Sequence, residues 1–211
     1  MATAPLGEAG LADGVAMLSR RDPDLAQIVA ALGPPPLWPR SPGFPTLIRI
    51  ILEQQVSLAS AQAAFDRLLA LASPLTPERF LALDDASLKA AGFSRQKMGY
   101  GRELARSLLD GSLDLVALEA LGDDAVRQTL TRVKGIGRWT ADIYLLMALQ
   151  RPDAWPSGDL ALATAVQRVK GLSARPQPDE LERLSESWRP WRAVAARLFW
   201  HHYLSTPRVS R

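Results

Sequence analysis

The chain has 211 residues, of which 47% are hydrophobic, enough to bury the core of one large domain or of two small lobes. It contains no cysteine, which excludes disulfides, thiolate catalysis and Cys-ligated zinc or iron–sulfur clusters, and its two adjacent histidines are too few for a histidine-based metal site. A net charge of +3 is a mild lean toward polyanions and does not by itself establish nucleic-acid binding.

Neither export nor membrane insertion is predicted. The sequence has no apolar run approaching the roughly 20 residues that cross a bilayer, and its first residues lack a basic segment followed by an apolar stretch. We therefore expect a soluble protein that is not exported and has no membrane partner.

The apolar residues recur at helical spacing along nearly the whole chain, as in Leu47, Ile50 and Ile51. Sustained period-two runs of β-branched residues are absent, so an all-α fold is predicted. In chain order, a short helix is expected over about 22–32. A proline-rich loop over 33–45 follows, which we expect Trp38 and Phe44 to order.

Several helix boundaries can be read from capping residues. Starts are marked by Thr76 with Pro77, by Ser94 and by Asp123. Helix ends are marked by glycines, which suit a left-handed C-cap, at Gly92, Gly111, Gly122 and Gly171.

The most informative segment is LTRVKGIGRWTADIY, residues 130–144, in which one helix ends, a G-I-G turn follows and a second helix begins. Glycines let the backbone approach another chain closely, and the unpaired N–H groups at the second helix start can bind an anion such as a DNA phosphate. Lys134 and Arg138 would add positive charge. A G-x-G turn taken alone is more often a plain helix-to-helix connection.

The wider sequence resembles the helix-hairpin-helix DNA glycosylase superfamily, and within it the 3-methyladenine DNA glycosylase II family. The resemblance rests on VKGIGRWTADIYLL, on the aspartate of PSGDLAL twenty residues after Trp139, and on three further blocks in the family's order: ILEQQVSLASA, LKAAGFSRQKMGYGRELARSLLDG and SWRPWRAVAARLFW. Together they cover most of residues 44–203. The resemblance implies a compact, all-helical form without the β-rich N-terminal lobe of longer relatives.

The resemblance implies that Asp159 is the catalytic carboxylate. Breaking the bond between base and sugar leaves an oxocarbenium-like sugar, which a nearby carboxylate stabilises. From the residues alone Asp159 is better explained as a helix N-cap, because DLALATAVQRV is predicted to be a helix that starts just after it. Both roles can hold together. Gly158 departs from the many relatives that carry a second acidic residue there.

The resemblance also implies a base pocket lined by Trp139, Trp200 and Tyr144, whose rings suit a cationic alkylated base. Bifunctional relatives carry a lysine at the position of Trp139, and tryptophan cannot form a Schiff base, so base release without strand cleavage is expected. From the residues alone, Trp139 is also explained as a buried anchor of the hairpin. Ile143 departs from relatives that place a tyrosine there.

Further roles are implied for groups that would hold the DNA. Gln55 corresponds to the family position whose side chain fills the gap left by a flipped base. Without the resemblance, a polar residue at a helix end is an equally good explanation of Gln55. The phosphate-binding hairpin is expected to comprise Lys134, Gly135, Ile136, Gly137, Arg138 and Thr140. A structural Na⁺ or K⁺ would be held by the backbone carbonyls of Thr131, Val133 and Ile136, with no cofactor required for catalysis.

The expected architecture has two lobes with a DNA-binding cleft between them. Residues 1–64 and 145–211 would form the lobe that carries Asp159, and residues 65–144 the lobe that carries the hairpin. The expected function is excision of 3-methyladenine, 7-methylguanine and similar bases from double-stranded DNA by a monomer. With that function, the expected location is the bacterial cytoplasm with the nucleoid, or the nucleus of a eukaryote. The alternatives are a glycosylase for another damaged base and a helix-hairpin-helix DNA-binding protein without catalysis.

Overall fold

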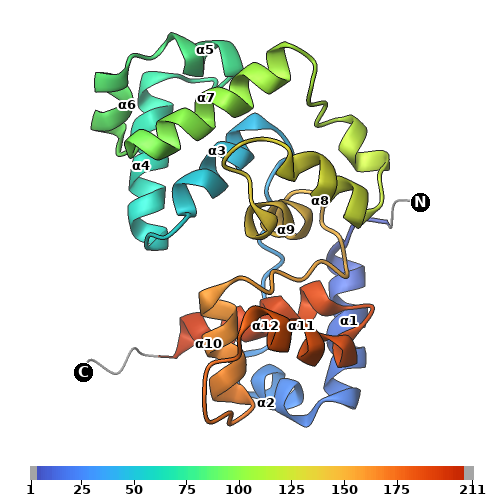
Figure 1. Cartoon of the computed structure of the whole chain (residues 1–211). Helices are drawn as coiled ribbons and strands as arrows, with labels where there is room; N and C mark the ends of the chain where they lie inside the picture. The colour runs from blue at the N-terminus through green and yellow to red at the C-terminus, as the bar shows by residue number, and fades with distance from the viewer. Residues whose placement is uncertain (1–3, 207–211) are drawn as a thin grey trace. The chain divides into compact units, whose positions relative to one another are not determined.

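The computed structural model describes residues 4–206, and within that range the chain forms helices and no strand, which confirms the all-α prediction (Figure 1). In chain order the α-helices and the two 3-10 helices (η) are α1 Glu8–Arg21, α2 Pro23–Leu32, α3 Phe44–Glu53, α4 Leu58–Leu71, α5 Pro77–Ala82, α6 Asp85–Ala91, α7 Arg95–Leu109, η1 Ala117–Ala120, α8 Asp123–Thr131, α9 Arg138–Met147, α10 Leu160–Val169, α11 Pro178–Ser185, η2 Glu186–Trp188 and α12 Arg192–Ser205.

The helices divide into two compact units. Unit 1 comprises residues 40–144 and unit 2 comprises residues 4–39 and 145–206 of the described chain. The expected boundary after residue 144 is found, but residues 40–64 belong to the unit that carries the hairpin, not to the other one. The physical reason is that α3 packs against α4 and α7, so its apolar face is buried inside unit 1. The cleft between the units stays a prediction.

Unit 1 is built around aromatic side chains from three separate segments. Phe80 of α5 is fully buried, with its ring edge-on to Phe44 at a centroid distance of 5.8 Å and tilted against Phe93 at 5.7 Å. Gly101 of α7 lies against the Phe80 ring, where an added Cβ would come within 2.5 Å of Cζ. The rigid packing of α3, α5 and α7 supports the turn and hairpin described below.

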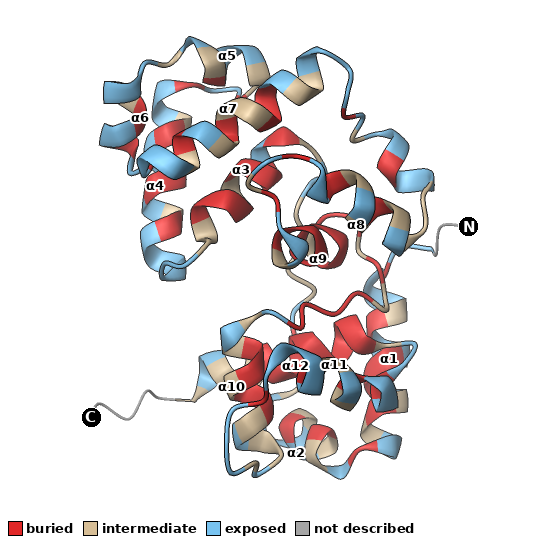
Figure 2. Ribbon diagram, viewed as in Figure 1, coloured by how far each residue is buried: buried red, intermediate tan, exposed pale blue. Residues whose placement is uncertain are grey.

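Unit 2 is built around α12, which is buried from Arg192 to Trp200 (Figure 2). A helix that is buried all round serves as a core element and not as a surface helix. Arg197 lies at its centre with no solvent exposure, and its guanidinium donates to the carbonyls of Leu37, Ala193 and Leu146 at 2.8–3.0 Å. Burial lowers the pKa of Arg197 to about 10. These three bonds tie the proline-rich loop and the end of α9 to α12.

A polar anchor joins α2 to α10 within unit 2. Lys170, the C-cap residue of α10, places Nζ 2.6 Å from Asp22 and 2.8 Å from Asp24, and the Trp188 indole N–H donates to Asp22 at 2.7 Å. Burial alone would raise the pKa of Asp22, but the hydrogen bonds from Lys170 and Trp188 outweigh it and lower that pKa. Asp22 also caps α2.

Helix α1 was not predicted, because two glycines interrupt its sequence and weaken the helical pattern. Tertiary packing compensates for them. A Cβ added at Gly14 would lie 2.8 Å from Val194 Cγ2 and 3.0 Å from the Trp191 ring, so the glycine allows α1 to approach α12 closely.

Most predicted helix boundaries are confirmed. The side chains of Thr76 and Ser94 cap α5 and α7, and left-handed glycines follow α6, α7 and α10. Gly122 was wrongly predicted to end a helix: its φ is −71° and it is the N-cap residue of α8. None of the helices in residues 4–206 is long and apolar enough to span a bilayer.

Candidate active site and hairpin

Asp159 is the N-cap residue of α10, as its sequence context predicted. Its Oδ1 accepts the backbone N–H of Leu162 at 2.7 Å, and its own N–H donates to the Pro156 carbonyl at 2.9 Å. The side chain is half-buried. A carboxylate at this position is stabilised by the positive end of the helix dipole. The cap therefore fixes the position of a carboxylate that is partly accessible to solvent.

Trp200 of α12 makes the second contact to the same carboxylate. Its indole Nε1 lies 3.2 Å from Asp159 Oδ1, and the residue is 8% exposed. Two N–H donors from two helices thus converge on one oxygen, inside unit 2. Trp200 presents its N–H edge to Asp159, an orientation that the sequence did not specify.

The two other predicted pocket aromatics lie on α9. Trp139 is half-buried in the first turn of that helix, beside the hairpin. Tyr144 is fully buried, and its hydroxyl accepts the backbone N–H of Gly43 at 3.0 Å. Burial raises the pKa of the Tyr144 phenol. Because no part of its ring is exposed, Tyr144 is a core residue of unit 1 and does not line an open pocket wall.

The hairpin between α8 and α9 has one face turned into unit 1. Ile136 is 3% exposed and Thr140 is 1% exposed, and the Thr140 hydroxyl accepts the side-chain amide of Gln54 at 3.0 Å. The side chains of these two residues, both of which were predicted to belong to the phosphate-binding hairpin, are therefore packed inside unit 1. Lys134, Gly137 and Arg138 are exposed.

The two glycines of the hairpin differ in their surroundings. Gly135 has φ +95° and lies against the Tyr100 ring, where an added Cβ would come within 2.1 Å of Cγ. Gly137 has no neighbouring atom within 4 Å of the corresponding position, and its carbonyl accepts the N–H of Ala141 at 3.1 Å. Both glycines were predicted as positions where another chain approaches the backbone closely. The Tyr100 ring thus leaves no room for a side chain at Gly135, whereas Gly137 has open space on its Cβ side.

A buried carboxylate ties α8 to α9. Asp142 is fully buried and accepts Arg127 Nε at 2.6 Å, while Arg138 Nε lies 3.6 Å from its other oxygen. Burial alone would lower the pKa of Arg127, but Asp142 outweighs it and raises that pKa. The pair fixes the angle between the two helices and hence the shape of the turn.

The turn between α3 and α4 carries Gln55, which is exposed and has φ +57°, in the left-handed region. For a residue with a Cβ this conformation costs about 1–2 kcal/mol. Gln54 precedes it and donates its side-chain amide to the Gly135 carbonyl and to Thr140. This link could not be predicted from the sequence, because no local pattern pairs Gln54 with a residue 81 positions later. Lys97, another missed residue, also contacts the turn.

The predicted cation ligands lie at the end of α8 and in the following turn, where the Val133 carbonyl accepts the Ile136 N–H at 3.0 Å. Backbone carbonyl oxygens are donors of the kind that suit Na⁺ or K⁺. Among residues 4–206, no group of three or more His, Cys, Asp or Glu side chains is placed to hold a metal ion.

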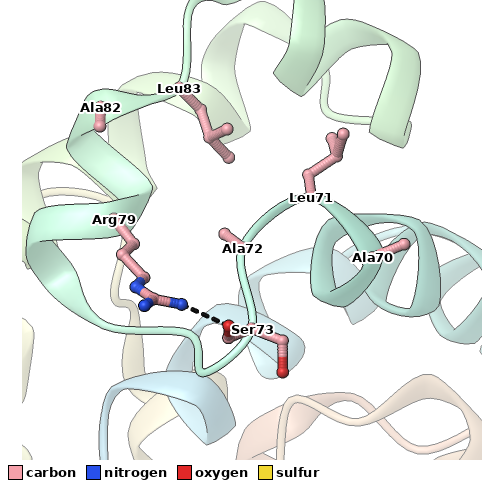
Figure 3. A pocket seen from close by; sticks show the side chains of 7 residues that line it. All are labelled: Ala70, Leu71, Ala72, Ser73, Arg79, Ala82 and Leu83. Carbon is pink, nitrogen blue, oxygen red and sulfur yellow. Dashed lines mark hydrogen bonds between the residues drawn. The ribbon is translucent and has the colours of Figure 1, made fainter.

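A shallow hollow of about 410 Å³ lies between the end of α4 and α5 in unit 1 (Figure 3). Arg79 and Ser73 are among its lining residues, and Arg79 donates to the Ser73 carbonyl. No carboxylate and none of the predicted site residues line it; its walls are Ala70, Leu71, Ala72, Ser73, Arg79, Ala82 and Leu83. We assign no function to it.

The hairpin and the capped aspartate both lie within the part of the chain that matches a known family. Residues 48–190 match the HhH-GPD superfamily of base excision DNA repair proteins, and the chain belongs to that superfamily. The resemblance inferred from the sequence is thereby confirmed.

Particular relatives agree with this assignment. The chain is 28% identical over 190 residues to an alkylbase DNA glycosidase-like protein of Schizosaccharomyces pombe, covering 87% of this chain and 89% of that protein. It is 31% identical over 166 residues to DNA-3-methyladenine glycosylase 2 of Escherichia coli, covering 73% and 55%. Its structure is similar to that of the S. pombe 3-methyladenine DNA glycosylase in complex with abasic DNA, with a TM-score of 0.82 and 26% identity over 89% of this chain and 95% of that one.

Proposed function

We propose that the protein is a DNA glycosylase that hydrolyses the N-glycosidic bond of alkylated purines, such as 3-methyladenine and 7-methylguanine, in double-stranded DNA. The observation that carries the proposal is Asp159, a half-buried carboxylate fixed by the Leu162 N–H and the Trp200 indole N–H. The names of the E. coli and S. pombe relatives support the choice of alkylpurines.

In the proposed reaction the damaged nucleotide leaves the stack before the bond is cleaved. The C–N bond breaks and its electron pair stays with the purine nitrogen, while positive charge develops on the deoxyribose. Asp159 stabilises that charge. Water then adds to the anomeric carbon and loses a proton, which gives a free base and an abasic site.

Other residues bind the substrate in this scheme. The exposed backbone of the hairpin at Gly137, with Lys134 and Arg138, binds a phosphate. Gln55 fills the gap in the stack, and the Trp139 ring contacts the cationic base. A Na⁺ or K⁺ held by the carbonyls of Thr131, Val133 and Ile136 would add positive charge toward the phosphate.

The strand stays intact in this scheme, because Trp139 offers no amine to attack the sugar. Borohydride treatment of wild type with lesion-containing DNA is expected to trap no covalent adduct. A trapped adduct would show that the enzyme has lyase activity. We further propose that the enzyme acts as a monomer.

Asp159→Asn tests the proposed role of Asp159. Asparagine caps a helix as well as aspartate does, so the free energy of unfolding should change by less than about 1 kcal/mol. Loss of the negative charge should slow release of 7-methylguanine from a methylated duplex by about 100-fold or more, an effect typical of removing one electrostatic group. Full activity of the variant would refute the mechanism. A wild type that binds duplex DNA but releases no base would indicate a DNA-binding protein without catalysis.

A further inference from the structure

The turn that carries Gln55 is held in place by contacts with other segments of unit 1. Helix α3 ends at Glu53 and α4 begins at Leu58, and residues 55–57 between them are exposed. Gln55 adopts a left-handed conformation with φ +57°, which a residue with a Cβ keeps only where its surroundings fix it. The neighbours of this turn therefore decide where Gln55 points.

Gln54 connects the turn to the hairpin. Its Nε2 donates to the Gly135 carbonyl at 3.0 Å and to Thr140 Oγ1 at 3.0 Å. Both acceptors belong to the hairpin and the first turn of α9, and the Thr140 side chain is buried. One amide thus contacts both sides of the glycine turn.

Lys97 holds the same turn from α7. Its Nζ donates to the Leu52 carbonyl in the last turn of α3 at 2.7 Å and to the carbonyl of the C-cap residue Gln54 at 2.8 Å. A cation at this end of a helix is favourable for the helix dipole. One turn further along α7, Tyr100 packs against Gly135. A single helix therefore supports both the turn and the hairpin.

We propose that Gln54 and Lys97 are positioning residues that make the hairpin and the Gln55 turn one rigid block. Phosphate bound at the hairpin then sets how far Gln55 reaches into the DNA stack. This inference rests on the proposed function for the identity of the ligand. The proposed role of Gln54 and Lys97 is to position the turn, and neither residue takes part in the bond cleavage.

The test compares the full-length wild type with Gln54→Met, which keeps the length of the side chain and removes both donors. Gln177→Met, at an exposed position in unit 2, is the matched control. The substrate is 7-methylguanine in a duplex, opposite either cytosine or an abasic site, because an unpaired base costs less to flip. Single-turnover excision, affinity for undamaged duplex and melting temperature are measured for each.

We expect Gln54→Met to slow excision opposite cytosine by about tenfold and opposite the abasic site by less than about threefold. Affinity for undamaged duplex should stay within about twofold, since the phosphate contacts remain. The double variant with Gln55→Ala should be no slower than Gln55→Ala alone, as coupled residues are not additive. Lys97→Met should act like Gln54→Met, and Lys97→Arg should restore the wild-type ratio of the two rates.

Equal losses on both substrates together with a lower melting temperature would overturn the inference and leave a purely structural role. Fluorescence of 2-aminopurine beside the lesion separates this inference from the proposed function, because it reports unstacking without catalysis. A wild type that unstacks the base and releases none refutes the proposed function alone. A Gln54→Met variant that unstacks the base like wild type refutes the inference alone.

Discussion

Alanine at each of the two hairpin glycines should separate folding from DNA binding. At Gly135 the added Cβ would lie 2.1 Å from Tyr100 Cγ and φ is +95°. The left-handed conformation costs about 1–2 kcal/mol and the overpacking about 1–3 kcal/mol, so Gly135→Ala should lose about 2–5 kcal/mol of stability. For a chain of this size that corresponds to roughly 4–20 °C in melting temperature.

At Gly137 the same substitution meets no atom within 4 Å. Its cost should stay below about 1 kcal/mol, the difference between glycine and alanine next to a helix start. The methyl group would instead occupy the space through which a phosphate approaches the backbone N–H groups of α9. Gly137→Ala should therefore melt close to wild type and bind every duplex, damaged or not, about tenfold more weakly.

Thermal melting by circular dichroism and fluorescence anisotropy with an undamaged duplex measure the two effects. Gly7→Ala in unit 2, where a Cβ also meets nothing within 4 Å, serves as the control. The reasoning is refuted if Gly135→Ala melts like wild type, or if Gly137→Ala loses affinity for lesion-containing DNA alone.

Two further predictions concern unit 2. Trp200→Phe keeps an aromatic ring and removes the donor to Asp159, so base excision should fall by about 10- to 100-fold, the equivalent of one hydrogen bond to a charged group. A rate within twofold of wild type would contradict the positioning of Asp159 by Trp200. Asp22→Asn should lower the free energy of unfolding by about 1–2 kcal/mol at neutral pH. Because the folded-state pKa of Asp22 lies below its ordinary 3.8, this contribution is present above pH 3.8 and is lost as the pH falls through the folded value. Melting curves of both proteins should converge in acid, and a constant difference would contradict the ion pair with Lys170.

Local signals predicted the features of the fold that depend on neighbouring residues. The N-caps at Thr76, Ser94 and Asp159 and the glycine turn of the hairpin involve groups within about four positions of one another. Such patterns can be read directly from a sequence. Helix α1 could not be, because its packing against α12 brings together Gly14 and a residue 180 positions later.

The candidate site was predicted in its residues but not in their orientation. Family resemblance identified Asp159 and Trp200, but only coordinates show the indole N–H donating to the carboxylate. Thr140 and Tyr144 share the hairpin motif with exposed residues, yet both face the core of unit 1. Which face of a helix is buried depends on what packs against it. For the same reason residues 40–64 were assigned to the wrong lobe, because the packing of α3 against α4 and α7 could not be predicted from the sequence.

Polar contacts hold both ends of α10, the helix that begins after Asp159. At one end Asp159 receives Trp200 from α12, and at the other Lys170 reaches Asp22 and Asp24 at the start of α2. Its ten residues span about 15 Å, and one inserted residue would rotate one end by about 100° relative to the other. Side chains along α10 can therefore vary, but inserting or deleting a single residue would break the contacts at one of its two ends.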